Sequence, residues 1–309
     1  MLLERGHITA SMAVVITCHN RKEHTLACIR AVKAQEGFDN AVQIYIFDDG
    51  SKDGTGDAIR SLFPEVHVID GDGESYWNGG MRKAFAAAMD GGFDFYLWLN
   101  DDTTLHRNAL AHLLAAYQSA TAFYDKNAII VGSTRDSGIN KLSYGGWKSV
   151  SRVKRLKFKR VVPDVTGLIE CDSMNGNCVL IPTCVAERVG NLDPIFTHSM
   201  GDIDYGLRAR MMGVRNWVAP GFAGVCESNA GKGLWVDKSF YYGERWKKLL
   251  RPKGLPMYEW YIFTRRHAGV IWPLVWASPY FKLLVSPLVG RCTSQIPSPK
   301  CPPDEIGGK

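Results

Sequence analysis

The sequence lacks paired cysteines: eight cysteines are spread along 309 residues, and no two have the C-x-x-C spacing of a zinc site. This scatter argues against a structural zinc centre and indicates reduced thiols in a cytoplasmic protein. The first eleven residues also lack the apolar core of a signal peptide, since they include Glu4, Arg5 and His7. We therefore expect a protein that stays in the cytoplasm.

Nor does the chain contain an unbroken hydrophobic run long enough to cross a membrane. The one long apolar stretch, 268–289, is interrupted by Pro273, Pro279, Lys282 and Pro287. A spanning helix needs about 20 apolar residues, and interior prolines remove backbone hydrogen bonds. We expect two short helices lying in the membrane interface, with packing against the rest of the protein as the alternative.

Charge is unevenly distributed along a chain of ordinary composition, with 46% hydrophobic and 22% charged residues. Residues 238–309 contain 12 lysines and arginines against 4 acidic residues, a net of +8, which leaves −2 for the rest of a chain whose total is +6. The same segment holds many aromatic residues: Trp246, Tyr258, Trp260, Tyr261, Phe263, Trp272, Trp276, Tyr280 and Phe281. Together these features favour an anionic membrane surface over nucleic acid as the partner. We expect a membrane-associating helical extension at 238–293 and a flexible tail at 294–309, which is rich in proline and glycine.

Strand-like and helix-like patterns alternate through the first half of the chain. The expected strands are 12–17, 42–47, 66–70 and 93–99, and the expected helices are 23–34, 56–62, 79–89 and 107–118. Further strands are expected at 129–132 and 178–182. Such alternation is typical of repeated βα winding around a mostly parallel sheet. We assign residues 1–237 to one α/β domain.

Polar clusters follow three of these strands where each strand ends. Asn100-Asp101-Asp102 follows one strand, Asp48-Asp49 a second, and Thr17 to Arg21 a third. The carboxyl ends of parallel strands share one rim, where the ligands of open α/β sheets bind. Carboxylates at this rim predict a metal ion with a diphosphate. Capping of the next helix by Asp102 or Thr103 is the alternative.

Residues 133–172 break the alternation, with scattered glycines and serines. They include six basic residues, Arg152, Lys154, Arg155, Lys157, Lys159 and Arg160. These residues occupy both odd and even positions, so they would not lie on one face of a strand. We therefore expect a flexible or partly ordered excursion. It is either a solvated loop or a lid whose cations meet an anionic acceptor or the diphosphate.

Five blocks of sequence together resemble the inverting nucleotide-sugar glycosyltransferases of family 2. The blocks are VVITCHNR (14–21), FDDGSKDGT (47–55), YWNGG (76–80), LWLNDDT (97–103) and GDIDYGLR (201–208). The match covers roughly Met12 to Asn229, and the joint occurrence of five blocks is more specific than any one of them. The resemblance implies a Rossmann-like, glycosyltransferase A-type α/β fold: a mostly parallel central sheet flanked by helices, here with a helical C-terminal extension.

The resemblance also assigns a donor and metal site to the shared rim. Asp102 falls on the last position of the family's D-x-D pattern and is expected to hold a divalent metal, Mg²⁺ or Mn²⁺, against the diphosphate. Asn100 replaces the first aspartate of that pattern. Donor contacts are expected from Thr17, His19, Arg21, Asp49, Asn78, Gly79, Gly80, Lys83 and Asp101. The alternative for His19 is a structural role. The alternative for residues 77–80 is a plain tight turn.

Asp202 matches the acid of the family's E-D-x-D pattern that is expected to deprotonate the acceptor hydroxyl. Gly201 replaces the glutamate. Asp204 lies two residues on, and the two carboxylates diverge if the segment is helical. Arg208 is expected to pair with one of these acids or to reach a phosphate. A role of Asp202 as a helix N-cap is the alternative.

The resemblance implies a metal-dependent, inverting transferase that moves a sugar from a nucleotide diphosphate donor to a lipid-linked glycan. The 77–80 block is similar to bacterial rhamnosyltransferases of surface polysaccharide synthesis, which places the enzyme on the cytoplasmic face of the inner membrane. The family's late histidine ligand is missing, and Cys226, Glu227 or Asn229 are candidates to replace it. Alternatives are a sugar nucleotidyltransferase and a catalytically inactive nucleotide-sugar-binding protein. The sequence leaves the donor sugar, the acceptor and the oligomeric state open.

Overall fold

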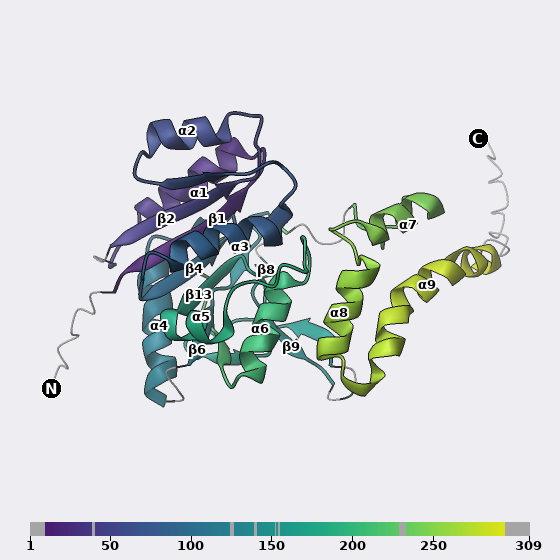
Figure 1. Ribbon diagram of the computed structural model, residues 1–309. Coiled ribbons are helices and arrows are strands. Elements are labelled where there is room, and N and C mark those ends of the chain that lie inside the picture. The colour runs from purple at the N-terminus through teal and green to yellow at the C-terminus, as the bar shows by residue number, and fades with distance from the viewer. Residues whose placement is uncertain are drawn as a thin grey trace, which may run out of the picture.

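The computed structural model describes residues 10–38, 41–123, 127–138, 141–151, 153, 155–228 and 233–293 (Figure 1). The tail that we expect to be flexible, 294–309, lies outside these described residues. The centre of the molecule is an eight-stranded sheet of order β11-β14-β6-β13-β4-β1-β2-β3.

The parallel half of this sheet is built from the strands expected in the first part of the chain. These are β1 (Met12–Cys18), β2 (Val42–Asp48), β3 (His67–Asp70) and β4 (Phe95–Leu99). β1 pairs in parallel with both β2 and β4, and β2 with β3. β1 and β4 are buried throughout, as expected of strands covered on both faces. The predicted α/β fold with a mostly parallel central sheet is therefore confirmed.

The other half of the sheet mixes directions. β6 (Ala128–Val131) and β14 (Arg215–Val218) are parallel to each other, while β13 (Cys178–Pro182) runs antiparallel to both β4 and β6. β11 (Ile169–Cys171) closes this edge, antiparallel to β14.

Helices cover both faces of the sheet, and each face has its own apolar core. Alternate side chains of β1 point to opposite faces, so Val14 packs with α1 (Lys22–Lys33), α2 (Thr55–Leu62) and α4 (Ala109–Phe123). Val15 packs on the other face with α3 (Tyr76–Met89), α5 (Thr183–Val189) and α6 (Gly201–Met211). Since α3 begins at Tyr76, the whole Trp-Asn-Gly-Gly block lies in its first turns rather than ahead of it.

The stretch 133–172, expected to be a flexible excursion, instead contains several short strands. They are β7 (Thr134–Arg135), β8 (Leu142–Tyr144), β9 (Gly146–Ser149), β10 (Phe158–Arg160) and β11. β9 pairs with β10 and with β12 (Ser173–Met174), while β7 and β8 join β5 (Thr104–Leu105) and β15 (Gly224–Val225). The guanidinium of Arg160 lies 5.7 Å from the ring centre of Tyr144 and 5.3 Å from that of Trp147. These cation–π contacts attach the basic Arg160 to ordered strands of this segment.

The C-terminal part is helical, with α7 (Tyr242–Leu250), α8 (Met257–His267), a 3-10 turn η1 (Gly269–Ile271) and α9 (Trp272–Thr293). The prediction of two short helices over 268–289 is wrong, because α9 continues through its prolines. Pro279 leaves the carbonyl of Val275 without its helical donor, and the Ser278 hydroxyl donates to that carbonyl at 2.9 Å instead. Figure 1 shows α9 bending partway along its length, as a helix with an interior proline does. Among the helices described, none is both long enough and apolar enough to span a membrane.

Helix α8 is held against α6 by a buried carboxylate. Asp204, fully buried, accepts hydrogen bonds from Arg208 at 2.7 Å, Arg266 at 2.6 Å and His267 at 2.8 Å. Burial alone would raise the pKa of Asp204, but the hydrogen bond from His267 and the charge of Arg208 outweigh it and hold that pKa below its ordinary value. Phe263 of α8 packs on Phe196 beside this network. The first part of the expected extension is therefore packed on the α/β unit.

We expect Asp204→Asn to lower the free energy of unfolding by about 3–5 kcal/mol, because it leaves buried cations without their carboxylate. The folded pKa is lowered, so the wild-type contribution is complete above the unfolded pKa, roughly 3.9, and is lost as the pH falls through the folded value. The free energy of unfolding of Asp204→Asn should not show this decrease at low pH. Urea unfolding as a function of pH measures both effects. Asp57→Asn removes an exposed carboxylate from α2 and should cost less than about 1 kcal/mol; equal losses in the two variants would contradict the assignment.

Candidate active site

The pairing of β13 with β4 brings a loop from the second half of the chain to the acidic rim. Cys178 stands opposite Leu99, so residues 175–177 lie beside residues 100–102. The backbone N–H of Asn100 donates to the carbonyl of Asn177 at 3.1 Å. The alternative in which Asp102 or Thr103 caps the next helix is wrong, because α4 begins only at Ala109, after β5.

Arg21 joins the two acids of the rim. Its Nη1 lies 2.9 Å from Asp101 Oδ1 and its Nη2 lies 3.0 Å from Asp102 Oδ2. Burial raises the pKa of Asp101 to about 6 even though the charge of Arg21 opposes this shift. The second oxygen of Asp101 is buried and has no hydrogen-bond partner. The rim thus carries two adjacent carboxylates of which one oxygen is unpaired.

Trp77 is part of the site. Its indole Nε1 donates to Asn100 Oδ1 at 2.8 Å, which engages the amide oxygen that replaces the family's first aspartate. The benzene part of the indole, next to Nε1, packs on Gly176, since a Cβ on Gly176 would lie 2.4 Å from both Cζ2 and Cη2 of Trp77. The same position is 3.5 Å from the Cβ of Asp202. Asn100 and Asp202 therefore both lie close to the indole of Trp77.

Asp202 is fixed in the first turn of α6. Its Oδ2 accepts from the backbone N–H of Gly176 at 3.0 Å, and its Oδ1 accepts from the N–H of Ile203 at 2.8 Å. The helix N-cap is Met200, so the capping alternative for Asp202 is wrong. The pKa of Asp202 is raised by burial, although these hydrogen bonds oppose the shift. As predicted for a helical segment, Asp202 and Asp204 diverge, and Arg208 pairs with Asp204.

Asn78 and Gly201 fit one another. The side chain of Asn78 is buried, and its Nδ2 donates to the carbonyls of Asp193 at 3.0 Å and Phe196 at 2.5 Å. A Cβ on Gly201 would lie 1.7 Å from Asn78 Oδ1. Asn78 thus occupies the place from which a glutamate at 201 would extend, and its buried amide is not positioned for the donor contact that we predicted.

The other predicted donor residues surround the loop that enters α3. The Asp49 carboxylate accepts from the backbone N–H groups of Gly73, Ser75 and Tyr76 at 2.9–3.2 Å. The Nζ of Lys83 donates to Ser75 Oγ at 2.8 Å and lies 4.8 Å from the ring centre of Phe47. These contacts fix the loop at the ends of β2 and β3.

Thr17, His19 and Gly80 also have internal contacts. Thr17 Oγ1 donates to the carbonyl of Phe47 at 3.2 Å, and a Cβ on Gly80 would lie 2.1 Å from that same hydroxyl. Gly80 therefore lets α3 approach β1, a close approach that only glycine allows. The Nδ1 of His19 donates to the carbonyl of Asp49 at 2.6 Å. Gly79 is partly exposed.

Sequence reasoning missed the roles of Trp77 and His198. His198 Nδ1 accepts from the backbone N–H of Trp77 at 3.4 Å, and burial lowers the pKa of His198 to about 4. No pattern in the sequence links His198 to Trp77, which is 121 residues away. At the position of the family's late histidine, Cys226 Sγ donates to Asp102 Oδ1 at 3.3 Å and Asn177 Nδ2 lies 3.5 Å from that sulfur. Asn229 lies outside the described residues.

The rim fits a divalent cation only in part. The unpaired oxygen of Asp101 and the adjacent Asp102 are hard oxygen donors of the kind that Mg²⁺ and Mn²⁺ bind. Within the described residues, no three metal-binding side chains converge on one point. A cation held here would take its remaining ligands from the diphosphate and water.

We expect Gly201→Ala to destabilise the fold by about 1–3 kcal/mol, because the new methyl group overlaps Asn78. In an Asn78→Ala background the same change should cost much less, and a double-mutant cycle by urea unfolding measures this coupling. Gly79→Ala is the control, since a Cβ there would make an ordinary contact of 3.4 Å with Ser75. If the two losses of stability, from the changes at 78 and at 201, simply add in the double variant, the contact between Asn78 and position 201 is contradicted.

Comparisons with known proteins agree with this geometry. Residues 13–168, half of the chain, match the profile of glycosyl transferase family 2. Among solved structures, the chain resembles the mannosyltransferase PcManGT from Pyrobaculum calidifontis, solved in complex with GDP-Man and Mn²⁺. That match has a TM-score of 0.53 and 15% identity and covers 93% of this chain and 76% of the other, so it supports the A-type fold alone. No curated protein sequence matches the chain. The profile match over half of its length shows that the chain belongs to glycosyl transferase family 2.

Proposed function

We propose that the chain transfers a sugar, with inversion, from a nucleoside diphosphate donor to an acceptor hydroxyl. The observation that carries this proposal is that Asp202 and Asn100-Asp101-Asp102 lie close together around the Trp77 indole. Asp202 offers a proton acceptor, and Asp101 and Asp102 offer carboxylates for a cation and diphosphate. Inverting transfer needs both functions at one sugar.

In the proposed reaction Asp202 takes the proton of the acceptor hydroxyl. The freed oxygen attacks the anomeric carbon and forms the new glycosidic bond. The bond from that carbon to the diphosphate oxygen breaks, and its electron pair leaves with the nucleoside diphosphate. The raised pKa of Asp202 supports this role, because a weaker acid is a better proton acceptor near neutral pH.

The leaving group is proposed to be neutralised at the acidic rim. When bound, a divalent metal, Mg²⁺ or Mn²⁺, supplies positive charge to the diphosphate, and Asp102 would hold it with help from Asp101. Arg21 is shared between both acids in the structure and is poised to exchange one of them for a phosphate oxygen. The PcManGT structure with GDP-Man and Mn²⁺ supports this arrangement by analogy.

Donor recognition is proposed for the loop that enters α3 and for the end of β1. Of the residues predicted to bind the donor, Lys83 and Arg21 are cations beside this rim, suited to a diphosphate. Thr17, His19, Asp49, Gly79 and Gly80 shape the backbone around it. The nucleotide would lie along this loop.

The acceptor is proposed to be a lipid-linked glycan of bacterial surface polysaccharide synthesis, with rhamnosyl-like chemistry suggested by the Trp-Asn-Gly-Gly block. The enzyme would then work on the cytoplasmic face of the inner membrane, with 238–293 facing the bilayer. Exposed apolar side chains on α8 and α9 support this, among them Tyr258, Leu274 and Phe281. Other aromatic groups join the two helices instead: Trp260 Nε1 donates to the carbonyl of Trp276 at 3.1 Å, and Trp276 Nε1 donates to that of Met257 at 3.1 Å.

We expect Asp102→Ala to abolish the metal-supported binding of the donor while leaving the fold intact, because Asp101 keeps its ion pair with Arg21. Thermal shift with a panel of nucleoside diphosphate sugars, with and without Mn²⁺, measures this, since a ligand of the folded state raises apparent stability. Asp90→Ala, which removes an exposed carboxylate at the end of α3, should bind as wild type. A normal Mn²⁺-dependent shift in Asp102→Ala would refute the metal assignment.

We expect Asp202→Asn to keep the donor-induced thermal shift and to lose transfer by roughly 10²-fold or more, the scale of general-base removal. The amide has the size of the carboxylate and its oxygen can keep one of the two hydrogen bonds from Gly176 and Ile203, but it cannot take a proton. Turnover of the donor that yielded the shift, with Asp90→Asn as the control, measures this. Unchanged turnover would place the base elsewhere, and donor binding without any turnover in the wild type would favour a non-catalytic binding protein.

A further inference from the structure

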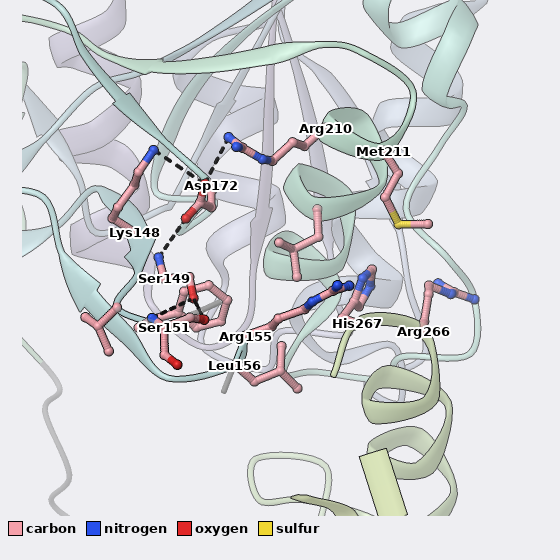
Figure 2. A pocket seen from close by; sticks show the side chains of 13 residues that line it. Lys148, Ser149, Ser151, Arg155, Leu156, Asp172, Arg210, Met211, Arg266 and His267 are labelled. Carbon is pink, nitrogen blue, oxygen red and sulfur yellow. Dashed lines mark hydrogen bonds and ion pairs between the residues drawn. The ribbon is translucent and has the colours of Figure 1, made fainter. Parts of the chain in front are cut away.

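A hollow of about 820 Å³ lies at the far end of α6 from Asp202 (Figure 2). It is enclosed by the β9–β10 hairpin, the last turns of α6 and the end of α8. Asp202 is in the first turn of α6 and Arg210 in the last, and eleven residues of helix span roughly 16 Å. This hollow is therefore separate from the site proposed for transfer.

Four cations and one carboxylate line the hollow: Lys148, Arg155, Arg210, Arg266 and Asp172. Lys148 and Arg210 both pair with Asp172, at 3.5 and 2.9 Å, and with Glu170, while Arg266 pairs with Asp193 and Asp204. Arg155 has no ion pair or hydrogen bond with any residue that the structure describes. Figure 2 shows its side chain extending toward His267. The other three cations are thus paired with carboxylates, and Arg155 is available to an anion.

A second hollow, of about 630 Å³, adjoins the first and shares Arg155 with it. Its other lining residues are apolar or small: Val153, Ala268, Gly269, Val270 and Trp272. Val270 is 96% exposed and Val153 is 66% exposed, so these side chains form an apolar shelf open to the surroundings. A Cβ on Gly269 would lie 3.5 Å from the guanidinium carbon of Arg155, which places the cation against this shelf.

A phosphate attached to a hydrocarbon chain matches both hollows at once. The anion would meet Arg155, with Lys148 and Arg210 behind it, and the chain would lie against Val153 and Val270. A free nucleotide would leave the shelf uncovered, and a purely apolar ligand would leave Arg155 unpaired. We propose that this double hollow binds the phosphate headgroup of an anionic phospholipid, with the apolar shelf at the edge of the acyl region. This inference deepens the proposed membrane association by naming the residues that make it.

The test is binding of the full-length protein to vesicles of phosphatidylcholine, alone or mixed with phosphatidylglycerol. We expect Arg155→Glu to weaken binding to the mixed vesicles by roughly 30-fold, since each unit of charge near an anionic surface changes affinity by about 5-fold. Arg30→Glu is the matched control, because it makes the same charge change at an exposed position on α1. Arg30→Glu should change binding by less than about 2-fold. The variant Arg155→Lys, which retains the positive charge, should keep most of the wild-type affinity.

The apolar shelf is tested separately with Val270→Asp, which alters a fully exposed side chain and should weaken binding to the mixed vesicles without affecting the fold. Equal losses in Arg155→Glu and Arg30→Glu would show that only net charge matters and would overturn the proposal, as would unchanged binding in Arg155→Glu. Full competition by inorganic phosphate would identify a free-phosphate site and overturn the lipid assignment.

Failure of this proposal can be told from failure of the proposed transferase function. Arg155→Glu should keep the donor-induced thermal shift with Mn²⁺, because Arg155 lines the hollow at the end of α6, whereas Asp102 lies at the rim with Arg21. Loss of that shift together with vesicle binding would mean general damage, and the lipid site would then not be supported. A wild type that binds vesicles but no nucleotide sugar would instead contradict the transferase function and leave the lipid site standing.

Discussion

The antiparallel pairing of β13 with β4 is the constraint on which the site depends. Because Cys178 is opposite Leu99, the residues before β13 must lie beside the residues after β4. Gly176 then meets both the Trp77 ring and the Asp202 carboxylate. A slip of this register by one residue would turn every side chain of β13 to the other face of the sheet. The distance between Asp202, the proposed base, and the acidic rim is thus set by backbone pairing and by the packing of the Trp77 indole on Gly176.

The sequence predicts the parallel half of the fold well, because its strands are long apolar runs and its helices follow them directly. It fails over 133–172, where strands of two to four residues have no detectable periodicity and their basic residues suggest solvent. Spacing also predicts the pair Asp204 and Arg208, which are one helical turn apart. It cannot predict Arg266 and His267, which reach Asp204 from 62 and 63 residues away. Long-range polar contacts leave no local pattern to read.

The Trp-Asn-Gly-Gly block illustrates how the residues of a recognised motif can have structural roles that sequence reasoning misses. Its residues make contacts mainly inside the protein. Trp77 donates a hydrogen bond to Asn100, and Asn78 donates to two carbonyls of the 193–196 segment. Gly80 leaves room for the side chain of Thr17. The same packing explains Gly201, since Asn78 already occupies the space that a side chain at 201 would need. The missing side chain at Gly201 therefore makes room for the side chain of Asn78.

The C-terminal helices contact the helix that carries Asp202, the proposed base. Asp204 lies two residues from Asp202 on α6, and two of its three partners come from the end of α8. A cut at residue 238 would leave a fully buried carboxylate with Arg208 alone, a state that costs several kcal/mol when a buried ion pair is broken. The extension is thus part of the structure that holds the first turn of α6, even though composition sets it apart. Arg266 and His267 also line the hollow that we assign to a phospholipid. The proposed lipid site and the contacts that hold Asp204 therefore share one lining, at the end of α8 that packs on α6.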